Sequence, residues 1–459
     1  MPAASALHGA APSRGRVALL GLAVALVLAD SSVVTLALPE ILREFRVDVS
    51  EVAWVLTAYN LVLALTAVPA AWLARRVGAG RVAAAGALIF AGASLACALA
   101  TSLDPLVTAR AIQAVGGAAV VCAALELLAR ETGSDARAAG VWAAGGVAGA
   151  ALGPAIGGIL TQAVSWEAIF AVQVPLALAV LLALPGRLGA PARAPAPAGR
   201  PRPAPNLALL LLSAALTAAL FLLVILMIEG WLMEPAAAGF AVTVMPLAAL
   251  AGGWASRRLG SHAVRAATGT ILIGGGLAGL GLMAGATWTW TILPQILIGL
   301  GLGLTISALT DAALHGRSHQ VVHGGWTIAS RHAGVVLGLL LLTPIFTADL
   351  KRNTRDAELA GTALLLDADL APDHKLDLAQ ALAKRLRASG GRLPTLEPVF
   401  AANPAKDSEA AAQAKLQGDL QGQIERAATD AFSRSFLAAA FLGLLALIPI
   451  GLGRREVEL

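Results

Sequence analysis

The stretch VALLGLAVALVLADSSVVTLAL, from Val17 to Leu38, decides the fold class, and Asp30 is its single charged residue. About 20 apolar residues cross the hydrocarbon layer of a bilayer as a helix, at about 1.5 Å per residue. The stretch therefore predicts a membrane-spanning helix. Arg14 and Arg16 precede it as they would in a signal peptide, but the run is too long for a typical cleaved segment.

The amino-acid composition agrees with a membrane protein. Of 459 residues, 58% are hydrophobic and 13% are charged, whereas soluble domains have about 45–50% and about 25%. With a mean hydropathy of +0.76, an ordinary soluble enzyme is excluded, and the lack of short alternating segments excludes a membrane β-barrel. The apolar runs predict an all-α polytopic protein with twelve spans, at 17–38, 52–73, 82–101, 104–128, 139–162, 167–185, 206–228, 236–256, 266–286, 288–310, 325–347 and 434–453.

The spans divide into two six-helix bundles, residues 1–186 and 206–459. Between them lies a linker rich in proline and arginine, residues 187–205, whose prolines oppose a regular helix. Residues 349–433 are polar and contain all five lysines, and apolar residues at helical spacing recur in 373–389. We therefore predict a small helical extracytoplasmic insert between the last two spans, without an activity of its own.

Arginine placement predicts the orientation. Short outer loops would hold only Arg43 and Arg46, and this asymmetry is typical of a chain with both termini in the cytoplasm. The net charge of +5 then reflects topology rather than a nucleic-acid partner. The inner segments would hold Arg14, Arg16, Arg75, Arg76, Arg81, Arg130, Arg137, Arg187, Arg193, Arg200, Arg202, Arg257, Arg258, Arg265, Arg317, Arg454 and Arg455.

A repeat relates the two halves. AWLARRVGAGR begins at Ala71 and GWASRRLGSHA begins at Gly253, 182 residues later, and both follow the second span of their half. Two parallel halves around a central path are typical of transporters.

Charged side chains inside the hydrocarbon layer are costly and predict function. Asp30 lies nine residues before Pro39 and Arg110 six after Asp104, which puts both about 9–13 Å below the outer surface. Asp30 is therefore a candidate proton carrier and Arg110 its partner. A structural ion pair that never titrates is the alternative. Arg331 is a third intramembrane charge.

Several ordered motifs resemble the major facilitator superfamily, in its drug/proton antiporter branch. They are ADSSVVTLALPEI (29–41), WVLTAYNL (54–61), RAIQAVGGAA (110–119), GAALGPAIGGIL (149–160), SWEAIFAVQVP (165–175) and SRHAGVVLG (330–338). The resemblance implies the superfamily's fold, in the cytoplasmic membrane of a bacterium. Two features depart from the family pattern. Arg75 stands where the family's loop after the second span has an aspartate that helps lock the inner face, and related proteins often have fourteen helices.

The fifth predicted span carries the glycines of the antiporter motif. Residues three and four apart lie on one helix face, so small residues there let another helix approach closely, and an internal proline permits a bend. Both a rocking helix and static tight packing fit this pattern, and the resemblance favours the rocking helix. The candidate gating residues are Gly149, Gly153, Pro154, Gly157, Gly158, Arg75 and Arg331.

Uncharged polar residues within the spans suit an amphipathic ligand that is bound mostly by apolar area. The candidate cavity residues are Tyr59, Asn60, Gln113, Gln173 and Gln295. Bonds between helices are the alternative role for each of them.

The sequence therefore predicts a monomeric, proton-coupled exporter of small amphipathic compounds or drugs that works by alternating access. An importer or metabolite exporter of the same fold, a membrane sensor and a polytopic enzyme are alternatives. No nucleophile, phosphate loop or cofactor motif points to catalysis, and we expect no enzyme activity and no cofactor. Asp311, His315, His319 and His323 are spaced by four, but nearby glycines favour a loop, so no metal site is predicted.

Overall fold

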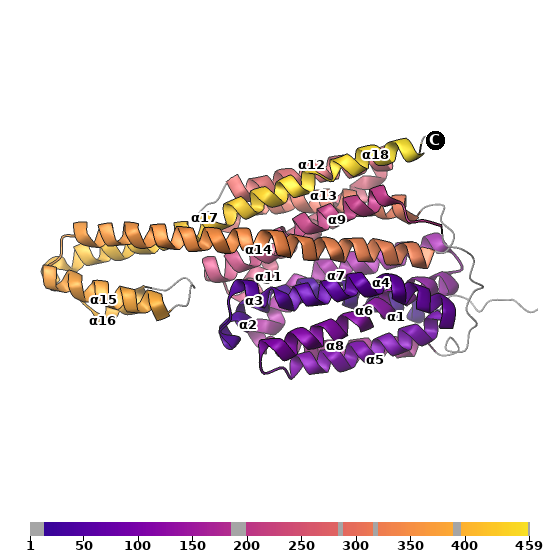
Figure 1. Cartoon of the computed structure of the whole chain (residues 1–459), viewed down its shortest axis with the longest axis horizontal. Coiled ribbons are helices and arrows are strands. Elements are labelled where there is room, and N and C mark those ends of the chain that lie inside the picture. The colour runs from indigo at the N-terminus through magenta and orange to yellow at the C-terminus, as the bar shows by residue number, and fades with distance from the viewer. Residues whose placement is uncertain (1–12, 185–198, 283–287, 315–319, 389–395, 458–459) are drawn as a thin grey trace, which may run out of the picture.

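The computed structural model describes residues 13–184, 199–282, 288–314, 320–388 and 396–457. Within these ranges the chain is helical, without strands, and its helices form one elongated bundle (Figure 1). Eleven of the described helices are long and apolar enough to cross a membrane, and a shorter apolar helix, Glu167–Ala183, stands where the sixth span was expected. The predicted all-α polytopic class is confirmed.

Within the described residues, the first half contains five helices long enough to cross a membrane, the shorter apolar helix at the sixth position and two short connecting helices. Between the first two spans, α2 begins at Leu38, has Pro39 in its first turn and is capped at its C-terminal end by Arg46, whose φ is 56°. Asp48 and Glu51 then form a capping box that starts α3. The helices are α1 (Arg14–Thr35), α2 (Leu38–Phe45), α3 (Val49–Val52), α4 (Trp54–Val77), α5 (Ala79–Ala98), α6 (Leu103–Thr132), α7 (Asp135–Ala163) and α8 (Glu167–Ala179), which η1 (Val180–Ala183) extends.

The second half begins within the predicted linker. Helix α9 starts at Pro203, because proline is tolerated in the first helical turn, so the last three residues of the expected linker are helical. Residues 185–198 lie outside the described ranges. The elements are α9 (Pro203–Thr217), η2 (Ala218–Leu222), α10 (Leu223–Ile225), η3 (Leu226–Gly230), α11 (Pro235–Ala255), η4 (Ser256–Arg258), α12 (His262–Leu282), η5 (Trp288–Thr291), α13 (Ile292–Leu314), α14 (Gln320–Asp367), α17 (Ala410–Leu444) and α18 (Leu447–Val457).

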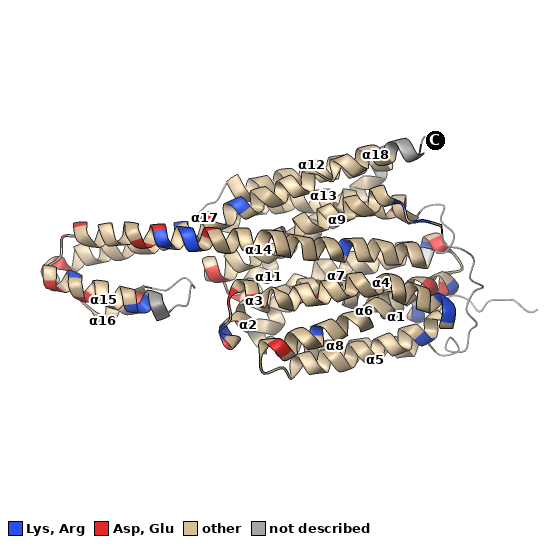
Figure 2. Ribbon diagram, in the orientation of Figure 1, with Lys and Arg blue, Asp and Glu red and all other residues tan. Residues whose placement is uncertain are grey.

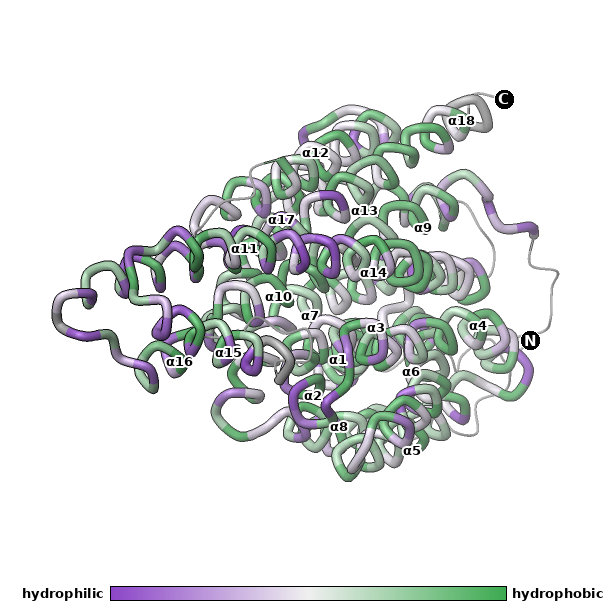
Figure 3. The backbone as a smooth tube through the Cα atoms, turned by 60° about the vertical axis from the view of Figure 1, so that its left-hand side comes forward, coloured by the Kyte–Doolittle hydropathy of each residue, from purple (hydrophilic) through white to green (hydrophobic). Residues whose placement is uncertain are grey.

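The polar insert continues two spanning helices beyond the bundle. Helix α14 has 48 residues and is about 72 Å long, and α17 runs back beside it (Figure 1). The helices α15 (Pro372–Ala388) and α16 (Glu397–Ala402) and the short η6 (Asp407–Glu409) complete this projecting arm, which is the more hydrophilic part of the chain (Figure 3). Its own small core contains Leu365, Leu370, Leu378, Leu382, Leu396, Val399, Phe400, Leu416 and Leu420.

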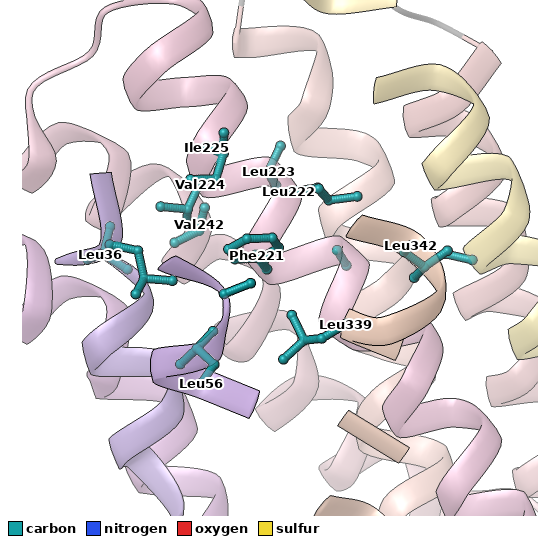
Figure 4. Packing of buried hydrophobic residues seen from close by; sticks show 14 of the residues in the cluster. Leu36, Leu56, Phe221, Leu222, Leu223, Val224, Ile225, Val242, Leu339 and Leu342 are labelled. Atoms are coloured by element: carbon teal, nitrogen blue, oxygen red, sulfur yellow. The ribbon is translucent and has the colours of Figure 1, made fainter. Parts of the chain in front are cut away.

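Charge separates the two ends of the molecule. Arginines gather where α1 begins and α4 ends, whereas the arm projects from the opposite end (Figure 2). We call the end where α1 begins and α4 ends the basic end. The two halves pack together through α7 against α11 and through α4 against α14. Nearer the arm, Leu36 and Leu56 of the first half share one apolar cluster with Phe221, Val242 and Leu339 of the second (Figure 4).

Candidate functional site

Asp30 of α1 and Arg110 of α6 form a fully buried ion pair. The distance between Asp30 Oδ2 and Arg110 Nη1 is 2.6 Å, and both side chains have an exposed fraction of 0%. The sequence placed these two charges at one depth, and the structure brings them into contact. A buried pair of this kind depends on further hydrogen bonds, because each charge has lost its hydration.

Two glutamines complete a closed circuit around this ion pair. Arg110 Nη1 donates to Gln113 Oε1 at 2.5 Å, and Gln113 Nε2 donates to Gln173 Oε1 at 2.6 Å. Gln173 Nε2 in turn donates to Asp30 Oδ1 at 2.9 Å, which closes the circuit. We call Asp30, Arg110, Gln113 and Gln173 the polar ring. Its members come from α1, α6 and α8, so a change of charge at one of them acts on three helices.

Aromatic rings cover the guanidinium of the polar ring. Arg110 lies 4.1 Å from the ring centroid of Tyr59 and 5.6 Å from that of Phe170. Its Nε donates to the carbonyl of Val55 at 3.2 Å, and the Tyr59 hydroxyl donates to the carbonyl of Val27 at 3.1 Å. Aromatic faces stabilise a desolvated cation, so these rings offset part of the cost of burying the guanidinium.

A second polar contact joins the two halves at the same depth. Asn60 of α4 bonds Ser31 of α1, with Nδ2 3.2 Å from Oγ, and its Oδ1 lies 2.6 Å from Nδ1 of His332 on α14. Sequence reasoning identified Asn60 but missed His332 and Ser31. His332 lies beside Arg331 in a motif already singled out, and this adjacency was the available signal.

The glycines of α7 face two different neighbours. A Cβ on Gly153 would meet the Ser32 hydroxyl of α1 at 2.1 Å, whereas one on Gly158 would meet the carbonyl oxygen of Pro235 on α11 at 2.4 Å. Gly149 and Gly157 also pack closely against the backbone of α1, and the carbonyl of Pro154 lies against Gly239 of α11. Helix α7 therefore connects the inside of the first half to the second half.

A groove of about 740 Å³ lies between α1, α7 and α8, with walls that are almost entirely apolar. Of the five candidate cavity residues, Gln173 lines it. Tyr59, Asn60 and Gln113 are buried in contacts between helices. Gln295, in the second half, donates from Nε2 to Oγ1 of Thr291, four residues earlier in the chain, at 3.0 Å. A role of these residues in contacting substrate stays a prediction.

The other candidate positions lie apart from the polar ring. Arg75 is buried near the basic end and lies 5.3 Å from the centroid of Trp72. In the repeated segment, Arg258 lies 4.4 Å from the centroid of Trp254. Arg331 is partly exposed on α14. Of the four residues spaced by four, His315 and His319 lie outside the described residues, and the described residues contain no cluster of metal-ligating groups.

The chain matches a known protein family over most of its length. The model described as Major Facilitator Superfamily matches residues 20–340. The chain belongs to the major facilitator superfamily. Members of the superfamily are carriers rather than enzymes.

Several curated relatives of this superfamily member are named as efflux or resistance proteins. Multidrug resistance protein Stp of Mycobacterium tuberculosis is 37% identical over 164 residues, 35% of this chain and 30% of the relative. Multidrug efflux pump LfrA of Mycolicibacterium smegmatis is 39% identical over 176 residues, 37% and 35% of the two chains. Methyl viologen resistance protein SmvA of Salmonella typhimurium is 35% identical over 156 residues, 33% and 31%. The chain thus spans about a third of the length of these relatives.

Among solved structures, the fold of this superfamily member resembles that of a bacterial homologue of the human lysosomal transporter Spinster, in an inward-facing and unoccupied conformation. The TM-score is 0.62 at 16% sequence identity, and the match covers 96% of this chain and 98% of the other. At this identity the likeness shows the fold alone.

Proposed function

We propose that this protein is a proton-coupled exporter of small amphipathic organic compounds or drugs, working by alternating access in a bacterial cytoplasmic membrane. The polar ring carries the proposal. Asp30 is the acidic member of a buried circuit that ties three helices together. A proton on Asp30 would remove its charge and weaken the bond to Arg110, and this change would reach α1, α6 and α8 at once. The name of the multidrug efflux pump LfrA, one of the relatives, supports export as the direction.

Transport driven by an imposed pH gradient tests this proposal. The purified protein is reconstituted into liposomes, and a panel of anionic, neutral and cationic fluorescent amphiphiles is followed. We expect at least one of them to move against its gradient, opposite to the proton flow. The proposal is wrong if no probe moves faster than in protein-free liposomes, or if movement occurs without any response to the pH gradient. Movement in the same direction as the protons would indicate an importer of the same fold.

We also propose that both termini lie in the cytoplasm and the arm outside. This orientation rests on the arginines gathered at the basic end (Figure 2). Single cysteines in place of Ser261 at the basic end and Gln380 on the arm test it, because both positions are exposed, whereas the native Cys97 and Cys122 are buried. In intact cells, an impermeant maleimide should label Gln380→Cys and spare Ser261→Cys. The reverse pattern would overturn the orientation.

Removing the arm should leave most of the transport rate, because its core is its own and lies far from the polar ring. Asn353 Nδ2 of α14 lies 3.2 Å from the carbonyl of Ala427 on α17, so a short Gly-Ser linker can replace residues 355–426. The bond between Asp349 and Arg434, 3.1 Å long, is retained. Complete loss of transport in a deletion variant that inserts and stays monodisperse would make the arm part of the mechanism.

A further inference from the structure

Arg331 lies on the face of α14 that turns toward the middle of the protein. It is nine residues, about two and a half turns, before Leu340, which is 53% exposed on the outer side of the helix. Arg331 is also seven residues after Gly324, so the two residues lie on the same face of the helix. A Cβ added to Gly324 would lie 2.9 Å from Leu125 of α6 in the first half. Arg331 therefore lies on the side of α14 that faces the first half, not on its lipid-facing side.

The flanking contacts of α14 agree with this direction. The next residue, His332, bonds Asn60 of α4, and Gly334 packs against the carbonyl of Leu210 on α9. Arg331 lies between these two lines of contact. Because Asn60 also bonds Ser31, Arg331 is at the membrane depth of Ser31 and of the neighbouring Asp30.

Arg331 has no ion pair and no hydrogen bond to any residue that the structure describes. The acidic residue at its depth, Asp30, already pairs with Arg110. Outside the described ranges, the sequence has one acidic residue, Glu458, next to the C-terminus. Asp30, Arg110 and Arg331 together leave one uncompensated positive charge in the middle of the membrane region.

We propose that Arg331 binds the anionic group of the transported compound, so that the substrates are amphipathic organic anions with a carboxylate or phosphate group. The proposal rests on the proposed transport function and names its substrate class. A cation without an ionic partner inside the membrane region is costly, and a bound anion would compensate it. The planar guanidinium offers paired donors that match the oxygens of a carboxylate or phosphate. On the same face, the partly exposed Val335 offers an apolar side chain to the rest of the molecule.

Equilibrium dialysis of the detergent-purified full chain tests this class. The probes share one apolar body and differ in charge: 2-naphthoate, 2-naphthyl phosphate, 2-naphthalenemethanol and 2-naphthylmethylammonium, with empty micelles as the blank. We expect the wild type to bind at least one anion at least about tenfold more tightly than the neutral and cationic probes, a difference of about 1.4 kcal/mol. Arg331→Gln should lose this preference, and Arg331→Lys should keep part of it.

Arg258→Gln is the matched control. It removes a cation from η4 at the basic end, and this variant should bind the probes as the wild type does. The proposal is overturned if neither anion is preferred by the wild type, or if Arg331→Gln binds the anions as the wild type does while eluting as a folded, monodisperse protein. Binding at equilibrium requires no pH gradient. A protein that binds the anions but ignores the gradient would therefore refute proton coupling and leave this inference standing.

Discussion

Asp30→Asn is expected to abolish accumulation of substrate against its gradient, down to the level of protein-free liposomes. The amide keeps the size of the side chain and can still accept the bond from Gln173, but it cannot exchange a proton. Transport is measured in proteoliposomes with an imposed pH gradient. Active accumulation by the variant would show that Asp30 is not an essential proton carrier.

The same substitution leaves Arg110 buried without its counter-charge, and removing one partner of a buried pair costs about 3–5 kcal/mol. A loss of activity must therefore be separated from a loss of folding. The double variant Asp30→Asn, Arg110→Gln removes both charges and should be more stable than either single variant, as measured by thermal unfolding in detergent. We expect it to remain inactive. A stable, proton-coupled double variant would reduce the polar ring to a structural element.

Gly158→Ala is expected to slow transport severalfold and to destabilise the protein by about 1–3 kcal/mol, the usual range for overpacking. Its Cβ would lie 2.4 Å from the carbonyl oxygen of Pro235, so α7 and α11 must move apart. Thermal unfolding and the rate of transport are measured together. Gly140→Ala on the same helix is the matched control, because a Cβ there has no neighbour within 4 Å.

Gly153→Ala separates the moving helix from static packing. The added Cβ would meet Ser32 within the same half. At a temperature where both variants are folded, Gly153→Ala should therefore lower stability but slow transport less than Gly158→Ala does. If Gly153→Ala and Gly158→Ala slow transport equally for an equal loss of stability, the contact between α7 and α11 has no special part in alternating access.

The sequence predicted the spans because about 20 apolar residues are needed to cross a bilayer, and such runs are visible directly. It also predicted that Asp30 and Arg110 lie at one depth, since helical rise converts residue number into distance. The hydrogen bonds of Gln113 and Gln173 were not predicted. They depend on how α6 and α8 are rotated about their axes, and helices that are apolar all round give no such signal.

The arm shows a different limit. Hydropathy falls sharply after residue 348, which suggested a separate insert, yet the backbone of α14 continues to Asp367. Apolar periodicity reports which surroundings a helix meets, whereas the hydrogen-bonded backbone passes from lipid to water unchanged. In the sequence, the passage of one helix from lipid to water therefore looked like the end of a span and the start of a separate insert.

The continuity of α14 makes it a lever. Arg331 faces the first half, and Asp367 at the far end of the helix is 36 residues, or about 54 Å, away. A tilt of about 10° around Arg331 would displace the far end by about 9 Å if the helix stays straight. A rearrangement of small amplitude at the centre of the membrane would thus be magnified at the surface, where a spectroscopic label can read it without touching the transport path.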